Sequence, residues 1–112
     1  MAASPTEEIA MIVTVFRSRL AAGQEEQYRA RAAQLSGLAR TMPGYVAHKT
    51  YVAEDGERLT LVEFADREGM DAWARHPEHA AGKREGRETY FSDYRVQVCT
   101  VERDSADRRS RG

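Results

Sequence analysis

Two short helices are indicated by the sequence WARHPEHAAGKREGRETYFSDY, residues 73–94, which holds the only tryptophan and two of the three histidines of the chain. Pro77 lies within it, and proline is tolerated in the first turn of a helix because its missing N–H has no partner there. We therefore predict that one helix ends at His76 and that the next begins at Pro77. The bend between them directs Trp73, His76 and His79 toward a shared region.

The residues before this stretch predict a β-hairpin followed by the first of the two helices. Residues 45–53 and 58–65 are rich in β formers, and Asp55-Gly56 between them is a turn signal. Asp66 has a side chain suited to cap the short helix that follows.

The second helix is expected to run from Pro77 to about Phe91. Its spacing puts four polar or aromatic residues along one side, namely His79, Lys83, Arg87 and Tyr90. Residues 94–101 then alternate as a last strand.

The first half of the chain predicts one strand and one long helix. Residues 8–19 are apolar on both sides of a strand, which is typical of a central position in a sheet. Residues 24–42 carry apolar side chains at three- and four-residue spacing, with two glutamates in the first turn, as in an amphipathic helix. Pro43-Gly44 is expected to end this helix.

The order strand, helix, strand, strand, helix, strand is the ferredoxin-like βαββαβ pattern of the α+β class, with the helices on one face of an antiparallel sheet. We expect one folded domain over residues 8–103. Residues 1–7 are predicted to be a flexible leader, and residues 104–112 a charged, disordered tail.

The strands are apolar on both faces, so the face away from the helices also needs a cover. Val46 and Val52 lie on one side of their strand, and Tyr45 and Tyr51 on the other. We predict that a second copy supplies the cover, in a homodimer with its two sheets packed together.

Composition and charge indicate which kinds of ligand the protein binds and in which cellular compartment it is found. The net charge is −1 over 112 residues, which gives no electrostatic reason to expect nucleic acid or an anionic membrane, and small neutral or aromatic ligands fit better. Cys99 is the single cysteine, and the chain begins without a secretory signal. We predict a soluble cytoplasmic protein with no membrane-spanning segment.

The aromatic and titratable residues near Pro77 suggest a site for small aromatic molecules. Trp73 and Tyr90 have rings that can stack on a substrate, His76 and His79 titrate near neutral pH, and Tyr94 or Arg87 can donate to an oxyanion. His79 is our preferred general base.

Each of these residues also has a purely structural interpretation. A lone tryptophan on an apolar helix face is usually a core residue, which is the stronger expectation for Trp73. His76 and His79 can serve as helix-junction residues, one of which caps a backbone carbonyl or crosses a dimer interface. The run from Lys83 to Glu88 is expected to be a solvated helix face.

Two strand residues and the cysteine complete the candidates. His48 is assigned to the ligand site from the second strand, and Glu63 from the third, where it faces the same way as Leu59 and Leu61. A glutamate among leucines is costly unless it is paired, so an arginine or tyrosine partner is the expected alternative. Cys99 is predicted to be a small buried filler. Three histidines and one cysteine make a thin ligand set, so no metal is predicted.

An ordered series of motifs over residues 8–103 resembles the antibiotic biosynthesis monooxygenase domain family. The motifs are PGY at 43–45, YVAEDGE at 51–57, LVEF at 61–64, WARHPEH at 73–79, GRE at 86–88 and YRVQVC at 94–99. The resemblance implies a dimeric α+β barrel. It also implies relatives that oxidise polyketide anthrones to quinones without a cofactor, and others of the same fold that degrade haem.

Three functions follow from the resemblance and the residues. The first is an enzyme that oxidises an aromatic or polyketide-type molecule of secondary metabolism, with O2 as co-substrate and no bound cofactor. The second is a haem-binding or haem-degrading relative. Phe16 stands where those relatives have an asparagine, and Lys83 or Arg84 where they have the proximal histidine. Neither a lysine nor an arginine is an ordinary haem ligand, which argues against haem binding. The third is a non-catalytic dimeric module that binds a small molecule.

Overall fold

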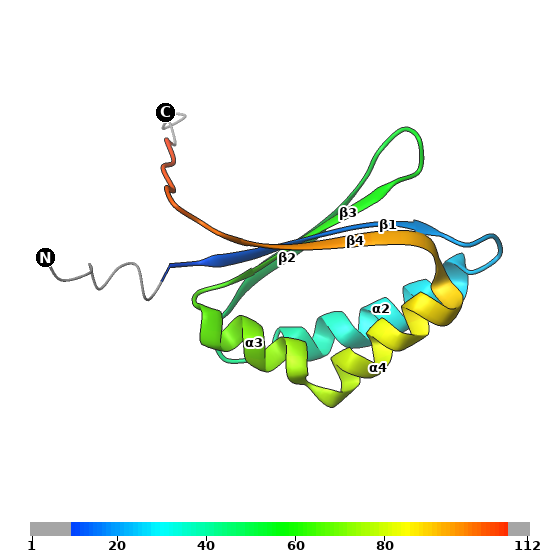
Figure 1. The fold of residues 1–112 in the computed structure, drawn as a ribbon, viewed down its shortest axis with the longest axis horizontal. Helices are drawn as coiled ribbons and strands as arrows, with labels where there is room; N and C mark the ends of the chain where they lie inside the picture. Colours follow the sequence, from blue (N-terminus) through cyan, green and yellow to red (C-terminus); the bar gives the residue numbers. More distant parts are fainter. Residues whose placement is uncertain (1–9, 108–112) are drawn as a thin grey trace, which may run out of the picture.

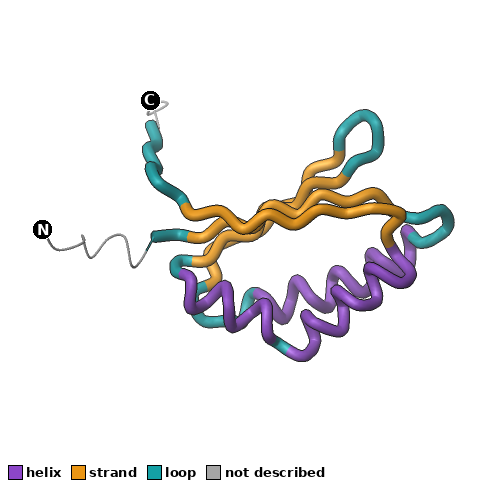
Figure 2. Tube along the Cα trace, viewed as in Figure 1, coloured by secondary structure: helices purple, strands orange, loops and turns teal. Residues whose placement is uncertain are grey.

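A computed structural model of the chain describes residues 10–107, which fold into one four-stranded sheet with every helix on the same face (Figures 1 and 2). The elements in chain order are β1 (Ile12–Leu20), α2 (Glu25–Ala39), β2 (Tyr45–Val52), β3 (Arg58–Phe64), α3 (Arg67–Arg75), α4 (Pro77–Glu85), the π-helical turn η1 (Gly86–Tyr90) and β4 (Phe91–Thr100). The strand order is β2-β3-β1-β4, and all neighbours are antiparallel. The predicted α+β ferredoxin-like fold is confirmed.

β1 is a central strand, as its apolar residues on both sides predict. Ile12 lies opposite Phe64 of β3 and Thr100 of β4, and the pairing continues along the strand. Residues directly opposite each other in an antiparallel sheet point to the same face. The even-numbered residues of β1, from Ile12 to Ser18, therefore face the helices with their partners, and the odd-numbered residues face away.

The core lies between the helices and the part of the sheet formed by β1 and β3. Its buried residues come from four elements, and they are Ile12, Ala39, Phe64, Met70 and Trp73. Trp73 is 5% exposed, so the expectation that it belongs to the core is confirmed. The Thr14 hydroxyl donates to the Met70 sulfur at 3.2 Å, which ties β1 to α3.

The junction at Pro77 forms as predicted. Asp66 caps α3, because its carboxylate accepts the Gly69 N–H at 2.8 Å. His76 then separates the two helices and caps α4 with its own ring, whose Nδ1 accepts the Glu78 N–H at 3.1 Å. Pro77 occupies the first turn of α4, where it removes no helical hydrogen bond.

The second helical segment ends about where we predicted, but its last turn is of another type. It runs from Pro77 to Tyr90, with α4 ending at Glu85 and a π-helical turn from Gly86 to Tyr90. The Phe91 N–H donates to the Gly86 carbonyl, and β4 begins at Phe91, three residues earlier than predicted. The Phe91 ring packs edge-on against Phe16 and Tyr28, and this tertiary contact overrides the helical spacing.

The other face of the sheet is not covered by a helix, and it mixes apolar with charged side chains (Figure 1). It presents side chains from all four strands, including Val13, Val15, Tyr51, Leu59, Leu61 and Cys99. Cys99 was predicted to be buried but is exposed, because it lies opposite Val13 on this face, where no helix packs. The exposure of this face agrees with the two-faced apolar pattern of the strands.

The structure describes residues 10–107, so it covers the predicted domain from residue 10 onward and only the first residues of the predicted tail. Residues 104–107 are exposed and carry no regular structure, whereas the predicted leader and the rest of the predicted tail lie outside the described residues. Within residues 10–107, every helix is too short or too polar to cross a lipid bilayer.

Candidate active site

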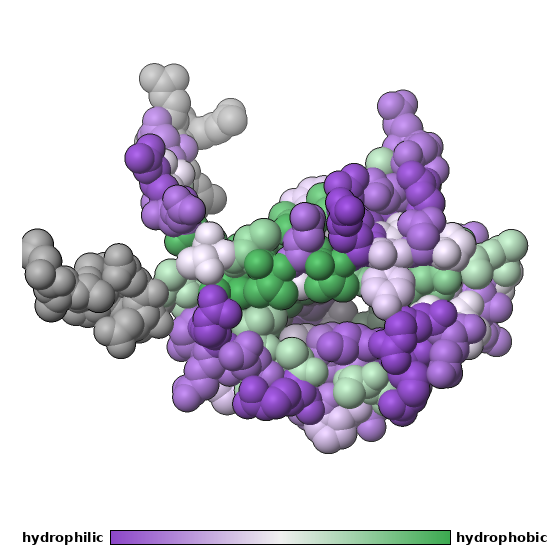
Figure 3. Space-filling view, in the orientation of Figure 1, coloured by the Kyte–Doolittle hydropathy of each residue, from purple (hydrophilic) through white to green (hydrophobic). Residues whose placement is uncertain are grey.

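The helices leave the β4 part of the sheet uncovered. Tyr94, Val96 and Val98 lie opposite Ser18, Phe16 and Thr14, so they point toward the helical layer. They are nevertheless 43%, 48% and 58% exposed. Figure 3 shows the surface hollowed between the sheet and the helices on this side, with hydrophobic residues above the hollow and a mixture of hydrophilic and weakly hydrophobic residues below it. We call this space the β4 hollow, bounded by these three residues of β4 and by α4.

Aromatic rings close one end of the β4 hollow. The ring centroid of Phe91 lies 5.3 Å from those of both Phe16 and Tyr28, with edge-on angles of 68° and 66°. Tyr94 extends the cluster, at 6.1 Å from Phe91 and 6.2 Å from Phe16. This end of the hollow is therefore walled by ring carbon.

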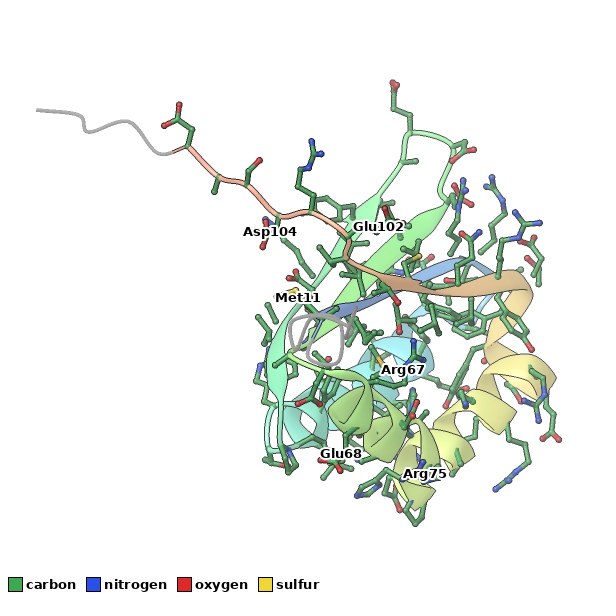
Figure 4. All side chains as sticks on the ribbon, turned by 60° about the vertical axis from the view of Figure 1, so that its left-hand side comes forward. Met11, Arg67, Glu68, Arg75, Glu102 and Asp104 are labelled. Carbon is green, nitrogen blue, oxygen red and sulfur yellow. The ribbon has the colours of Figure 1, made fainter. Side chains whose placement is uncertain are left out.

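The first turn of α3 lies at the opposite end. Figure 4 places Arg67 and Glu68 there, whereas Glu102 and Asp104 lie on the segment that leaves β4 on the side of the sheet away from the helices. β1 and β4 stay paired at this end of the sheet, since the Val101 N–H donates to the Met11 carbonyl at 2.9 Å. The hollow thus has an aromatic end and an end bordered by the first turn of α3.

One side of α4 faces the β4 hollow. Gly86 packs against the Phe91 ring beneath the sheet, and His79 lies seven residues earlier, on the same side of the helix. The His79 ring stacks on Trp73 with centroids 4.3 Å apart and an angle of 11°. Its Nδ1 lies 3.0 Å from the Trp73 carbonyl oxygen, which can only accept, so Nδ1 carries the proton. The lone pair of the neutral ring is therefore on Nε2.

The surroundings keep the His79 imidazole neutral. Burial lowers its pKa to about 4, because the charged ring loses hydration, and the hydrogen bond to Trp73 opposes this only in part. Lys83 and His76 lower the pKa further by charge repulsion. At neutral pH the ring is a hydrogen-bond acceptor at Nε2, and it holds an added proton only weakly.

His76 lies beside the same tryptophan but has a different environment. Its ring centroid is 5.8 Å from that of Trp73. Its Nδ1 accepts the Glu78 N–H, so the carbonyl cap expected of one of the two histidines is found at His79 and not at His76. Its assignment as a catalytic group stays a prediction.

The structure does not bring His48 and Glu63 to the β4 hollow. His48 lies on β2, the opposite edge of the sheet, where its Nδ1 is 2.6 Å from the Tyr45 hydroxyl. Burial, and secondarily Arg40, lowers the pKa of His48. Glu63 lies opposite Val13 and faces away from the helices. The partner expected for Glu63 is not found: within residues 10–107 its carboxylate makes no hydrogen bond or ion pair.

The remaining predicted site residues lie at the aromatic end. Tyr94 faces the β4 hollow directly, and Tyr90 packs edge-on against Tyr28 at 5.9 Å. Arg87 is exposed in the π-helical turn. Lys83 and Arg84 are exposed as expected, although Glu85 is not free and binds Arg31 of α2 at 2.8 Å.

Sequence reasoning missed the residues that give the hollow its shape. They are Phe16, Tyr28, Phe91, Val96 and Val98. The alternation of residues 94–101 was a usable signal, since it places Tyr94, Val96 and Val98 on one face, but it does not tell which face the helices leave open.

No metal centre emerges in the part of the chain that the structure describes. Histidine, cysteine, aspartate and glutamate side chains of residues 10–107 form no group of three that could hold an ion. The groups that the structure places at the aromatic end and on the α4 side of the hollow are aromatic rings, aliphatic side chains and one neutral imidazole.

Comparison with known proteins agrees with this architecture. The uncharacterised protein YqjZ of Bacillus subtilis is 27% identical over 100 residues, which cover 89% of this chain and 87% of that protein. Rv0793 of Mycobacterium tuberculosis has a similar structure, with a TM-score of 0.76 at 17% identity over 88% of this chain and all of that one. SnoaB of Streptomyces nogalater, described as a cofactor-independent oxygenase, gives a TM-score of 0.73 at 13% identity over 88% and 99% of the two chains. These two structures show the shared fold.

The family itself is identified by sequence. The model of the antibiotic biosynthesis monooxygenase family matches residues 11–85, from β1 to the end of α4, which is more than half of the chain. The chain belongs to the antibiotic biosynthesis monooxygenase family.

Proposed function

We propose that the protein is a cofactor-independent monooxygenase that oxidises a small aromatic, polyketide-type molecule bound in the β4 hollow. The observation that carries the proposal is the uncovered apolar side of β4, where Tyr94, Val96 and Val98 point toward the helices and stay about half exposed. Buried apolar area would stabilise the fold, so its exposure beside an aromatic wall favours a ligand as the cover. Family membership supports the class of reaction.

The reaction needs no electrons from the protein. A methylene carbon between aromatic rings loses two hydrogens and gains one oxygen atom of O2 as a carbonyl, and the other oxygen atom leaves as water. The substrate supplies all four electrons once it is deprotonated to an electron-rich anion. His79 would accept this proton at Nε2, while the Tyr94 hydroxyl would donate to the oxyanion.

The low pKa of His79 defines which substrates fit. An imidazolium with a pKa of about 4 returns its proton readily, so His79 is a weak base. It can take a proton only from a substrate whose C–H or phenolic O–H group is unusually acidic. An aromatic ketone that tautomerises to a phenol meets this requirement. It also matches the ring carbon that lines the hollow.

Oxygen uptake with anthrone, a three-ring ketone of this kind, tests the proposal. We expect O2 consumption and a quinone product from the wild type, and a large loss of turnover in His79→Ala. Arg84→Ala is the matched control, because Arg84 is exposed on the far side of the same helix. Failure of the wild type to consume O2 with anthrone and with simpler phenols would overturn the proposal.

A non-catalytic binding module is the second candidate. The observation that favours it is the same low pKa, since a weak base beside an apolar hollow suits a group that only accepts a hydrogen bond from a ligand. Saturable binding of anthrone without O2 uptake would select this function. Turnover by the isolated protein would exclude it as a complete account.

We also propose that two copies pair through the open face of the sheet. Val13, Val15, Leu59 and Leu61 share this face with Tyr51, which is 47% exposed. An isologous dimer would bury them. Light scattering at micromolar concentration should give twice the chain mass of 12.6 kDa, and Leu61→Arg should give a monomer. A monomeric wild type would contradict the proposal.

A further inference from the structure

Gly86 brings the helix backbone into contact with an aromatic ring at the end of the β4 hollow. A Cβ atom at this position would lie 2.5 Å from Cε2 and 2.9 Å from Cδ2 of Phe91. Side chains do not approach this closely, so only glycine lets the Phe91 ring rest on the π-helical turn. The ring is held there by a stiff backbone rather than by a mobile side chain.

The Phe91 ring also packs against the β1 strand of the sheet. Phe16 contacts it edge-on at 5.3 Å, and Phe16 is the direct partner of Val96, which lines the hollow. Tyr28 of α2 closes the third side at 5.3 Å. Phe91 is thus confined between the turn, the sheet and α2, and it adjoins the open apolar side of β4.

We propose that Phe91, seated on Gly86, sets the length of the β4 hollow and so determines the size of aromatic ligand that it accepts. This inference rests on the proposed function, because it assumes that the hollow binds a ligand. The ligand lies with its apolar ring end against Phe91 and its acidic hydroxyl or ketone toward His79. The two positions are seven residues apart on the helix, about 10 Å along its axis, which exceeds the length of a single benzene ring.

Two glycines on one helical segment provide a matched pair of variants. Gly86→Ala should push the Phe91 ring into the hollow. Gly82→Ala creates the same overlap, with Cβ 2.5 Å from Cδ1 of Leu35, but on the side of α4 that packs on α2. The control therefore also creates a steric overlap, but away from Phe91 and with a single methyl group.

Titration calorimetry with phenol, 2-naphthol and 2-anthrol measures the size preference. Phe91→Ala should raise the affinity for 2-anthrol relative to phenol about tenfold, and Gly86→Ala should lower this ratio about tenfold. Gly82→Ala should leave the ratio unchanged, because a shift of α4 off α2 narrows the hollow for all three probes alike and does not move Phe91. Phe91→Leu should shift it in the same direction as Phe91→Ala, and it serves if the alanine variant does not fold. An unchanged ratio in a folded Phe91 variant would overturn the inference.

A wild type that binds none of the probes would instead overturn the proposed function. Crystals of the wild type and of Phe91→Leu under xenon pressure would then decide the present inference separately. Xenon in a volume that extends from the hollow into the space left by the ring would support Phe91 as the end wall. A sealed cavity at position 91, separate from the hollow, would refute it.

Discussion

The β3 half and the β4 half of the helix-facing side of the sheet have the same alternating pattern of residues. The helices bury the β3 half and leave the β4 half exposed. Phe64 on β3 is fully buried at 0% exposure, whereas Val98 on β4 is 58% exposed, although both point toward the helices. Trp73 and Met70 of α3 cover the first half, and no equivalent side chains of α4 cover the second. Apolar residues in a strand therefore serve stability in one half and remain available to a ligand in the other.

The position of α4 explains the difference. Glu78, Gly82 and Glu85 lie on the side of α4 that faces α2, where Gly82 packs on Leu35 and both glutamates bind Arg31. The helix is thus held sideways against α2, and it does not rise to cover β4. The β4 hollow is a consequence of helix–helix packing.

Truncation of the packed half should have the largest effect on stability. We expect Phe64→Ala to lower the free energy of unfolding by about 4 kcal/mol, because it leaves a cavity in the core. Val98→Ala in the open half should cost less than about 1 kcal/mol, since more than half of that side chain is already in water. Urea unfolding measures both, and equal losses would show that the two halves are equally packed.

Much of this comparison could be predicted from the sequence, but not its key element. Periodicity and turn residues predicted the order of strands and helices along the chain. They also predicted the junction at Pro77 and the cap at Asp66. The sequence could not show that Gly86 begins a π-helical turn, because the cause is a contact with Phe91 that forms only in the folded chain. His48 and Glu63 were assigned to one site because sequence does not reveal which edge or face of a sheet a residue occupies.

Acid should weaken the protein through His79, at the border between the two halves. Its pKa is lower in the folded chain, about 4 against 6.5, so the unfolded chain binds the proton first as the pH falls. Stability is then complete above pH 6.5 and falls as the pH drops toward 4, by about 3 kcal/mol in total.

Urea midpoints between pH 7 and pH 5 isolate this effect, because the ion-paired carboxylates Asp55 and Glu57 have lowered pKa values and titrate at more acidic pH. His79→Phe keeps a ring on Trp73 and should flatten the slope. His48→Gln is the control for the other histidine with a lowered pKa. A steep slope that persists in His79→Phe would mean that another group, and not His79, causes the loss of stability.

The caps of the helices should have a smaller effect. Asp66→Ala removes the acceptor of the Gly69 N–H at the beginning of α3 and should cost about 1 kcal/mol. Asp66→Asn keeps an acceptor and should cost less. Because α3 covers the packed half, the loss should appear as faster hydrogen exchange of α3 amides, with α2 unchanged; protection that falls equally in both helices would contradict a local cap.

The smallest change in stability should come from the contact that holds α4 on α2. Arg31 binds Glu85 at 2.8 Å and Glu78 at 3.2 Å, and its side chain is 18% exposed. Because partly exposed ion pairs contribute little to stability, Arg31→Ala should lower the free energy of unfolding by about 1 kcal/mol or less.

The effect of Arg31→Ala on the hollow should be larger than this figure suggests, because the release of α4 lets the helix move toward the exposed valines of β4. We expect weaker binding of 2-anthrol by Arg31→Ala, with the unfolding midpoint nearly unchanged. Arg19→Ala, which breaks the exposed pair with Asp55 at the hairpin, is the control that should alter neither. If Arg31→Ala bound 2-anthrol as the wild type does, the sideways packing of α4 would not be what keeps the β4 hollow open.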